Sequence, residues 1–364
     1  MSIHKIQVEF NKESFNTIYA NLEKLGDGQY AQVFKSCLRN PQSDVWNNEK
    51  FFANKKITFK NQELETIKNE IHIMNKIKSK YDELRIPVKD RNVIALIDYF
   101  KENKSIYLVL ELVAGGELLL ALENTPDFHF TEQQSAKYML QIFKAAEFMH
   151  KLNIVHLDLK PENVLCDEKL ENLKVADFGL SIDISRYGPD QKDNIRHMGG
   201  TLDYVSPEAL KYEPICLQTD MWSIGVILYI LVSGLSPFSD DDDNITRENV
   251  IKCEYDFHFV EFDYVSPEAK DIIKRLLLPD PKSRMLAFQC KGHDFITNNI
   301  GLEQGHGPPP SIGTRTLSQN FKGNLAKINK CRKKWRILKN AVVFANNLTG
   351  NNIVQVMKEH DLKE

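Results

Sequence analysis

The sequence predicts an α+β fold with two lobes, a small β-rich N-terminal lobe and a larger helical C-terminal lobe, followed by a basic amphipathic helix. Its 364 residues are more than one hydrophobic core usually organises, so a division into two compact parts is expected. Apolar residues follow mostly strand-like patterns from residue 22 to about 112 and helical patterns from 113 to about 297. Beyond residue 320, basic and apolar residues recur at helical spacing.

The overall composition excludes several classes of protein. With 42% hydrophobic residues, 27% charged residues and a formal net charge of −3, the chain has the profile of a soluble globular protein with no nucleic-acid partner. The N-terminus lacks an apolar signal core, and the longest apolar stretch, Met221 to Val232, is shorter than the roughly 18 residues of a transmembrane segment. Scattered cysteines without a C-x-x-C pair favour reduced thiols. We therefore expect a cytoplasmic location, with access to the nucleus as a second option.

One clear helix interrupts the strand-rich part. Its apolar residues recur at spacings of three and four, and therefore form one stripe: Leu64, Ile67, Ile71, Met74 and Ile77. Two strands are predicted next, at 93–100 and 105–112, separated by the turn K-E-N-K. The strand-rich part is therefore predicted to contain one amphipathic helix.

Helices are expected after Gly115 and Gly116. Thr131 and Gln134 have the spacing of a capping box ahead of an apolar periodic run. The stretch 222–232 is apolar on all sides, which is typical of a buried core helix. Ser266, followed by proline and glutamate, is the usual start of another helix, predicted to end near residue 278.

The string H-L-D-L-K-P-E-N at 156–163, followed by D-F-G at 177–179, is the most specific pattern in the chain. Asp158 can be the carboxylate beside an accepting hydroxyl, and Lys160 can neutralise charge on a phosphate in transfer. Asn163 and Asp177 supply the hard oxygen ligands that Mg²⁺ prefers. We interpret His156 as a structural residue. Residue type, spacing and order together resemble the protein-kinase signature.

A glycine-rich pattern precedes these motifs. Residues 26–33 read G-D-G-Q-Y-A-Q-V, and small residues there let the backbone approach phosphates closely. Glycine in an ordinary hairpin turn is the alternative interpretation. The pattern lies upstream of the other motifs, and this position favours the phosphate-binding interpretation.

Lys55, in F-A-N-K-K-I, matches the lysine that pairs with a helical glutamate in protein kinases, and Lys56 is the competing choice. The expected partner is Glu70, on the helix described above. A kinase needs this ion pair before the phosphates of ATP are held correctly. A surface lysine and a solvated glutamate are the alternative.

Taken together, the motifs predict a two-lobed protein kinase fold that uses ATP and Mg²⁺ as cofactors. The K-P-E sequence at 160–162 resembles serine/threonine kinases. The resulting domain boundaries are an N-terminal extension (1–21), a kinase domain (22–297, with an N-lobe to about 112 and a C-lobe from 113), a linker (298–320), an autoinhibitory or calmodulin-binding helix (321–348) and a tail (349–364).

Four strings resemble the death-associated protein kinase family of calmodulin-regulated serine/threonine kinases. They are E-L-V-A-G-G-E-L at 111–118, the catalytic string, T-D-M-W-S-I-G-V at 219–226 and R-K-K-W at 332–335. The resemblance implies that Leu110 is the gatekeeper and that Glu111 and Val113 present backbone to adenine. The implied nucleotide-binding residues are Gly26, Asp27, Gly28, Gln29, Tyr30, Ala31, Val33, Ala53, Lys55, Glu111, Val113, Glu117, Glu162 and Leu165.

The same resemblance implies how protein substrates are recognised. Glu117, Glu162 and Thr201 are the expected substrate-binding residues, with the two glutamates preferring arginine or lysine upstream of the phosphorylated serine or threonine. In the family, glutamate at the position of Glu208 pairs with arginine at the position of Arg284 and holds the lobe together. Leu202 stands where proline is usual, which leaves the fine substrate preference open.

Leu157 replaces the arginine that usually precedes the catalytic aspartate and that reads a phosphate on the activation loop. Without it, ordering of the loop by phosphorylation has lost its main partner. We therefore expect that phosphorylation of Ser181 or Ser185 is not required for activity.

The C-terminal region predicts a switch. No acidic residue occurs between residues 304 and 358, and apolar residues recur at helical spacing among the basic ones. Such a basic amphipathic helix fits the methionine-rich groove of Ca²⁺–calmodulin. The residues expected to bind calmodulin are Trp335, Val342, Leu348, Arg332, Lys333 and Lys334. A helix packed permanently on the large lobe and a contact with anionic membrane are the alternatives.

The leading functional prediction is an active serine/threonine kinase, autoinhibited by its tail until calmodulin binds. A pseudokinase or scaffold is the alternative class. Loss of Lys55, Asp158 or Asp177 would favour it, and all three are present.

Overall fold

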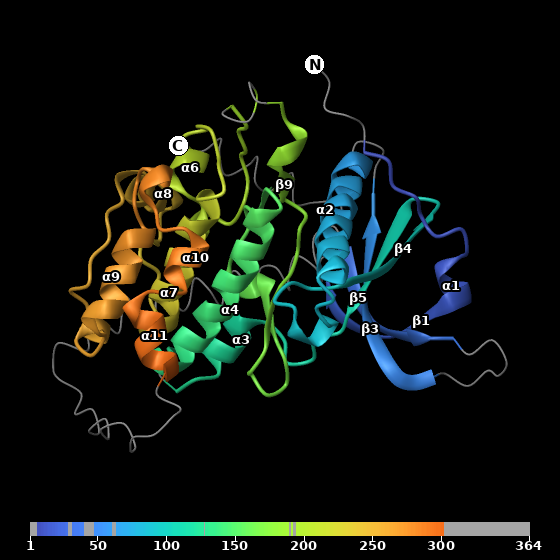
Figure 1. Ribbon diagram of the computed structural model, residues 1–364, viewed down its shortest axis with the longest axis horizontal. Coiled ribbons are helices and arrows are strands. Elements are labelled where there is room, and N and C mark those ends of the chain that lie inside the picture. Colours follow the sequence, from blue (N-terminus) through green and yellow to red (C-terminus); the bar gives the residue numbers. More distant parts are fainter. Residues whose placement is uncertain are drawn as a thin grey trace, which may run out of the picture.

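The computed structural model describes residues 6–27, 31–39, 47–59, 63–126, 128–188, 191 and 194–301. Figure 1 shows the two lobes side by side, with the sheet of the small lobe on the right and the helices of the large lobe on the left. The predicted α+β fold and its order, strands first and helices after, are confirmed.

The small lobe is built on a five-stranded antiparallel sheet with the order β1-β2-β3-β5-β4. Its strands are β1 (Tyr19–Asp27), β2 (Ala31–Leu38), β3 (Asn47–Thr58), β4 (Leu96–Glu102) and β5 (Ser105–Glu111). Side chains alternate between the two faces of a strand, so Lys55 and Lys56 of β3 lie on opposite faces. The position of Lys55 relative to β5 is fixed by its pairing with Leu108.

Helix α2 (Leu64–Glu83) covers the face of this sheet that is nearer the large lobe (Figure 1). The stripe predicted from the sequence is largely buried, with Ile67, Ile71, Met74 and Ile77 all below one tenth exposed. Burial of this stripe fixes which way the helix faces. Glu70, one residue before Ile71, is thereby also turned inward and is only 5% exposed.

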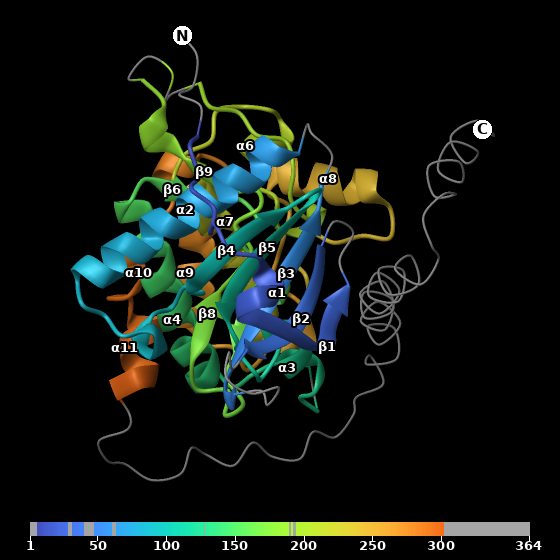
Figure 2. The same ribbon diagram turned by 90° about the vertical axis from the view of Figure 1, so that its right-hand side faces the viewer.

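The opposite face of the sheet is covered by the N-terminal segment and α1 (Phe15–Ile18), as Figure 2 shows from the small-lobe side. Here lies an outer aromatic cluster of Phe15, Tyr19, Phe52, Phe100 and Tyr107. The fully buried Phe15 ring stacks on Tyr107 with 4.6 Å between ring centroids. Strand β1 thus begins at Tyr19, before the predicted lobe boundary at residue 22, because aromatic residues of the preceding segment are part of the lobe's core.

Glu102 fixes the entry of this segment. Its Oε1 accepts hydrogen bonds from Ser14 Oγ at 2.7 Å and from the Phe15 backbone N–H at 2.6 Å. Farther upstream, the Asn11 backbone N–H donates to the Tyr99 carbonyl, and the Phe10 ring packs edge-on against Tyr99. The segment that precedes β1 is therefore held along β4.

The large lobe is mainly helical. Its helices are α3 (Leu118–Glu123), α4 (Glu132–Lys151), α6 (Pro207–Leu210), α7 (Thr219–Ser233), α8 (Asp243–Lys252), α9 (Pro267–Leu276), α10 (Ala287–Cys290) and α11 (Asp294–Ile300). Thr131 and Ser266 cap α4 and α9 as predicted, by accepting from the backbone N–H groups of Gln134 and Ala269. Every residue of α7 is buried, which confirms the predicted core helix.

Tight packing around α7 depends on glycine. A Cβ added at Gly225 would lie only 2.8 Å from Cβ of Leu276 on α9, so the two helices could not approach as closely with any larger residue. Gly234 ends α7 with φ of +72°, a conformation that glycine adopts without steric cost.

Two short antiparallel strand pairs lie in the large lobe. Strand β6 (Ile154–Val155) pairs antiparallel with β9 (Ile182–Asp183), and β7 (Val164–Cys166) pairs with β8 (Leu173–Val175). The segments 156–163 and 176–181 leave these strands at the cleft, so the two predicted motifs are brought together by short, fixed connections. Six 3-10 turns complete the described structure: η1 (Val88–Asp90), η2 (Pro161–Asn163), η3 (Ile184–Arg186), η4 (Leu202–Tyr204), η5 (Val260–Phe262) and η6 (Pro281–Ser283).

Among the residues that the structure describes, none of the helices has both the length and the apolar character to cross a membrane.

Candidate active site

Two adjoining cavities lie between the lobes. One, of about 340 Å³, has an apolar end formed by Leu25, Val33, Ala53, Leu110 and Leu165 and a polar end formed by Lys55, Glu70, Asn163 and Asp177. The other, of about 740 Å³, shares Lys55, Glu70 and Asp177 and is also lined by Asp158, Lys160 and Thr201. The residues predicted for nucleotide and for chemistry therefore face one continuous cleft.

A buried carboxylate fixes the loop that carries the catalytic string. Asp220 of α7, 1% exposed, accepts from the backbone N–H groups of His156 at 2.9 Å and Leu157 at 2.9 Å. His150 Nε2 lies 2.9 Å from the same carboxylate. Because these contacts come from the core helix, the loop has little freedom to move relative to the large lobe. Sequence reasoning did not assign this role to Asp220.

Leu157 has φ of +68°, which is uncommon for a non-glycine residue and carries backbone strain. The hydrogen bond to Asp220 and burial of its side chain among Val155, Ile195 and Ala209 hold it there. Leu157 thus contributes apolar packing at the position where most kinases have the arginine that binds a phosphate on the activation loop.

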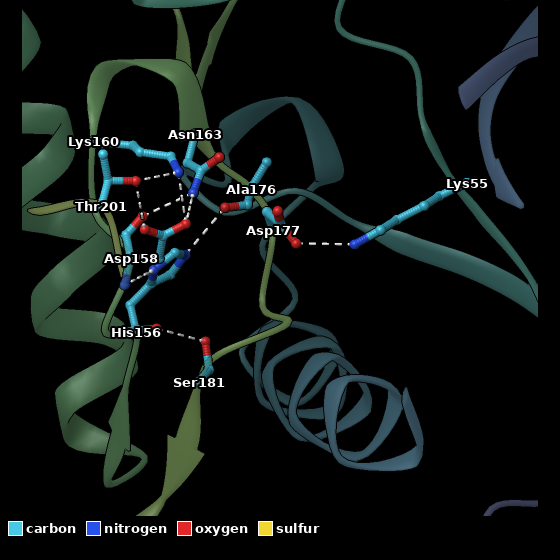
Figure 3. Close-up of polar contacts among 9 residues, drawn as sticks. All are labelled: Lys55, His156, Asp158, Lys160, Asn163, Ala176, Asp177, Ser181 and Thr201. Atoms are coloured by element: carbon cyan, nitrogen blue, oxygen red, sulfur yellow. Dashed lines mark hydrogen bonds and ion pairs between the residues drawn. The ribbon is translucent and has the colours of Figure 1, made fainter. Parts of the chain in front are cut away.

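Asp158 is surrounded by three polar side chains (Figure 3). Its Oδ2 lies 2.9 Å from Lys160 Nζ and accepts from Asn163 Nδ2 at 2.9 Å. Lys160 Nζ also donates to Thr201 Oγ1 at 2.8 Å. These contacts fix the direction of the Asp158 carboxylate, and they bring together the loop and the segment in which Thr201 lies.

Lys55 bridges the two lobes. Its Nζ lies 2.7 Å from Glu70 Oε1 on α2 and 2.9 Å from Asp177 Oδ1 (Figure 3 shows the second contact). Lys56 points to the outer face, where its Nζ lies 5.7 Å from the centre of the Tyr107 ring. Of the two candidates in the sequence, Lys55 is the one paired with Glu70.

The charges of this triad are coupled. Burial alone would lower the pKa of Lys55, but the carboxylates of Glu70 and Asp177 outweigh burial and raise it. Burial raises the pKa of Glu70, and Lys55 offsets only part of that effect. The Lys55 ammonium lowers the pKa of Asp177 to about 2, so Asp177 is a carboxylate at any physiological pH.

Asp177 has φ of +62°, and its neighbour Phe178 is fully buried against the His156 ring, with 5.0 Å between ring centroids. His156 Nε2 lies 3.1 Å from the Ala176 carbonyl (Figure 3). These contacts hold Asp177 in the cleft and are consistent with a structural role for His156.

A family model of the protein kinase domain matches residues 19–296. The chain belongs to the protein kinase family. Among curated proteins, this kinase is 40% identical over 286 residues to smooth muscle myosin light chain kinase of Gallus gallus, a match covering 78% of this chain and 14% of that protein. It is 36% identical over 285 residues to myosin light chain kinase 3 of Rattus norvegicus, covering 78% and 33% of the two chains. This chain therefore spans a third or less of these two relatives.

Solved structures with the same fold include the kinase regions of twitchin and of the giant muscle protein titin. The twitchin kinase region of C. elegans has a TM-score of 0.69 and 29% identity, over 88% of this chain and 52% of that one. The autoinhibited serine kinase domain of titin has a TM-score of 0.66 and 27% identity, over 78% and 82%. These relatives support the kinase family, and the narrower resemblance to death-associated protein kinases stays a prediction.

Protein kinases use ATP and Mg²⁺, and the residues of this cleft fit both. Asn163 and Asp177 offer an amide oxygen and an ionised carboxylate, the hard ligands suited to Mg²⁺, and both line the polar end of the cavity. Lys55, at the same end, is placed to contact phosphate oxygens. The apolar end is bounded by Val33, Ala53 and Leu165, which suits a flat aromatic base.

The connection between the lobes is fixed by a buried ion pair that sequence reasoning missed. Lys174 Nζ of β8 lies 3.1 Å from Glu111 Oε1, which also accepts from the Ala95 backbone N–H at 2.8 Å. The Glu111 backbone N–H donates to the Ala95 carbonyl at 3.0 Å. Burial raises the pKa of Glu111, and Lys174 offsets part of it.

Glu117 and Glu162 both line the nucleotide cavity, as expected for residues near the ribose and the substrate. Glu162 Oε2 is buried with no hydrogen-bond partner among the described residues. Burial raises the pKa of Glu162 to about 7, and the nearby Glu117 and Asp158 charges add to this effect. A buried carboxyl oxygen without a hydrogen-bond partner is suited to receive a cationic side chain from another molecule.

Glu208 and Arg284 form the buried pair that the resemblance implied. Arg284 Nη1 and Nη2 lie 2.8 and 2.7 Å from the two carboxylate oxygens, and both side chains are at most 2% exposed. The pair joins α6 to the turn at η6. Neither residue lines the cleft cavities, so the role of this ion pair is structural.

Some predicted residues cannot be placed. Of the glycine-rich loop, Gly26 and Val33 line the nucleotide cavity and Ala31 lines the adjoining one. The others, Gly28, Gln29 and Tyr30, lie outside the described residues, as does the side chain of Asp27. The whole predicted calmodulin-binding helix, with Trp335, Val342, Leu348 and Arg332–Lys334, also lies outside them.

Proposed function

We propose that this protein is a serine/threonine protein kinase that transfers the γ-phosphoryl group of ATP, with Mg²⁺, to protein substrates. The observation that carries the proposal is the position of the Asp158 carboxylate, held by Lys160 and Asn163 beside Thr201 and across the cleft from the Lys55–Glu70–Asp177 triad. This places one candidate base, one cationic group and two metal-binding side chains around a single cleft.

Each side chain has a part in that chemistry. Asp158 accepts the proton of the attacking hydroxyl, and Lys160 offsets charge that develops on the transferred group. Bound Mg·ATP supplies the phosphoryl group and neutralises its charge. Asn163 and Asp177 hold the metal, while Lys55, fixed by Glu70, orients the phosphates. The hydroxyl of Thr201, bonded to Lys160, orders the segment that receives the peptide.

The proposed activity is tested by phosphotransfer from ATP to serine peptides, with and without Mg²⁺. Phosphoserine formed only with Mg²⁺ supports the proposal. ATP binding without transfer to any of a broad set of peptides would instead favour the pseudokinase or scaffold.

We infer further that basic residues upstream of the phosphorylated serine are preferred, because Glu117 and Glu162 lie in the cleft. Glu162, with its pKa near 7, is neutral on the acidic side and charged on the basic side of that value. The KM for a peptide with an arginine that reaches Glu162 is expected to fall several-fold from pH 6 to pH 8. Steady-state kinetics at constant ionic strength measure it.

Two controls identify the group responsible. An otherwise identical peptide with alanine in place of the arginine should show no such fall in KM, and neither should Glu162→Gln with the original peptide. The raised pKa also affects folding stability. Because the folded protein binds a proton at Glu162 that the unfolded chain has already released, the contribution of Glu162 to the free energy of unfolding is lost as pH rises from about 4.5 through 7. An unchanged pH profile in Glu162→Gln would assign the effect to another group.

We propose that residues 321–348, which the sequence predicts to be a helix, inhibit the kinase and that Ca²⁺–calmodulin releases them, as in the death-associated protein kinases that the R-K-K-W string resembles. The basic amphipathic pattern supports calmodulin as partner. The autoinhibited state named for the titin kinase domain supports inhibition. An acidic cleft gives a basic helix a surface to cover.

Deleting residues 303–364 is expected to raise basal activity about tenfold or more and to abolish any response to Ca²⁺–calmodulin, because the inhibitory segment is gone. Phosphotransfer with and without calmodulin measures both. Trp335→Ala in the full chain serves as a finer variant and should weaken calmodulin binding in a pull-down. Equal basal rates for the full and shortened chains contradict autoinhibition, and calmodulin-independent binding to anionic vesicles would favour the membrane alternative.

A further inference from the structure

One face of α2 is directed at the segment that follows the D-F-G motif. Asn69, His72 and Lys76 are spaced three and four residues apart, and therefore lie on the same side of the helix. All three contact the stretch 181–186, which belongs to the activation segment between Asp177 and Glu208. Glu70 lies on the adjoining side of the same helix, so movement of this face moves Glu70.

Asp183 is the centre of these contacts. It lies in β9, where it pairs with Ile154 of β6, and it is only 3% exposed. Its Oδ2 lies 2.7 Å from Lys76 Nζ and 3.5 Å from His72 Nε2. Its Oδ1 accepts from Ser185 through both Oγ and the backbone N–H. Lys76 Nζ also donates to Ser185 Oγ at 3.0 Å.

The carboxylate is well compensated. Burial alone would raise the pKa of Asp183, but hydrogen bonds from Lys76 and Ser185 outweigh burial and lower it. Breaking a buried ion pair from one side leaves an uncompensated charge, which is strongly unfavourable. The contact between α2 and β9 is therefore a fixed connection in the folded kinase.

A second connection runs in parallel. Asn69 Nδ2 donates to the Ser181 carbonyl at 2.8 Å, and the buried Ser181 Oγ donates to the His156 carbonyl at 3.1 Å (Figure 3 shows the second bond). The helix that carries Glu70 is thus linked through the activation segment to the loop that carries Asp158.

We propose that Asp183 is a positioning residue that holds α2 in the orientation in which Glu70 reaches Lys55. This inference rests on the proposed kinase function. Asp183 supplies, as a permanent part of the chain, the negative charge that anchors this helix. Leu157, buried and apolar, cannot bind a phosphate on the segment, so the anchor comes from Asp183 itself. A phosphate on Ser185 would add charge beside Asp183, and is expected to loosen the connection.

The test compares Asp183→Asn with Lys78→Met in the full-length chain. The first removes the charge but keeps the shape. The second removes a solvent-exposed ion pair with Asp82 on the same helix, turned away from Asp183. For Asp183→Asn, the affinity for Mg·ATP, measured by equilibrium binding, and kcat are each expected to fall about tenfold, with peptide KM within twofold. Lys78→Met should change none of them.

A double-mutant cycle with Glu70→Gln decides whether Asp183 acts through Glu70. If it does, adding Asp183→Asn to Glu70→Gln lowers Mg·ATP affinity by much less than tenfold, because the pair it supports is already lost. Additive losses overturn the proposal, as does an Asp183→Asn protein with wild-type affinity. Because binding is measured without phosphotransfer, an inactive wild-type protein would refute the proposed function and still leave this cycle decisive.

A folding defect is separated by a second variant. Asp183→Asn combined with Lys76→Met removes the pair from both sides and leaves no unpaired charge, so it is expected to fold more stably than Asp183→Asn alone while still losing Mg·ATP affinity. Thermal unfolding monitors each protein. Recovery of full affinity in this double variant would show that the connection does not position Glu70, and would overturn the proposal.

Discussion

Replacing Asp158 with alanine is expected to lower kcat by about a thousandfold or more while leaving the affinity for Mg·ATP near that of the wild type. General base catalysis contributes on the order of 10²–10⁴ in rate, and here the same carboxylate also fixes Lys160 and Asn163. Its loss therefore removes the base and frees two neighbouring side chains. Steady-state phosphorylation of a serine peptide and equilibrium nucleotide binding measure the two quantities separately.

The matched control is Asp263→Ala, which truncates an exposed aspartate in the large lobe outside the cavities. Its kinetics should equal those of the wild type. Asp158→Asn adds a second comparison, because the amide keeps the size of the side chain and loses only the base. An Asp158→Ala protein that retains a tenth or more of wild-type kcat would show that another group takes the proton.

Arg284→Met is expected to destabilise the large lobe by about 3–5 kcal/mol, the range found when a buried ion pair loses one partner. The variant leaves the Glu208 carboxylate without its two guanidinium hydrogen bonds, at a position that is 2% exposed. It also deprives the carbonyls of Leu278, Gln218 and Pro279 of a donor. Urea unfolding measures the loss in the free energy of unfolding.

The double variant Glu208→Met with Arg284→Met tests whether the unpaired charge is the cause. It removes both ions, so a substantial part of the stability lost in Arg284→Met should return, although the three carbonyls stay without their donor. If the double variant is less stable than Arg284→Met, the main role of Arg284 lies in its contacts with those carbonyls. A single variant within 1 kcal/mol of the wild type would contradict the argument altogether.

The grouping of the candidate catalytic residues was the easiest feature of this protein to predict. Asp158, Lys160 and Asn163 belong to one short string, and a loop of that length cannot separate them in space. Lys55 and Asp177 are 122 residues apart in sequence, and their meeting was expected only because the kinase resemblance supplied the fold. The motif favoured Lys55 over Lys56, and alternation along β3 places the two side chains on opposite faces of the sheet.

The contacts that position the site were not predictable in the same way. Asp183 and Lys76 are 107 residues apart, and neither lies in a motif that marks chemistry. Lys174 and Glu111 pair for a similar reason, because β8 and β5, which belong to different sheets, come close only in the folded protein. A charged residue in a sequence looks the same whether it faces solvent or a buried partner. Which distant residues form such ion pairs depends on the topology of the fold, and the pattern of a single sequence does not reveal that topology.

Strand boundaries show a further limit. The apolar run from Val93 predicts a strand at 93–100, whereas β4 spans Leu96–Glu102. The reason is that the start of the run serves the other lobe: Val93 forms a bridge with Val175 of β8, and the Ile94 N–H donates to the Val175 carbonyl. Val93 and Ile94, which look like part of one strand with their neighbours, instead join the two lobes.

The packing of Phe15 into the outer aromatic cluster has a practical consequence for anyone who shortens this kinase. A recombinant protein begun at residue 19, where the family match starts, would lack the ring that stacks on Tyr107 and the backbone group that Glu102 binds. The uncovered rings of Tyr19, Phe52 and Phe100 would then form an exposed hydrophobic patch on the sheet, and such patches promote aggregation. Poor solubility of that shortened protein should therefore be attributed to the missing helix, and expression from residue 6 or earlier should avoid it.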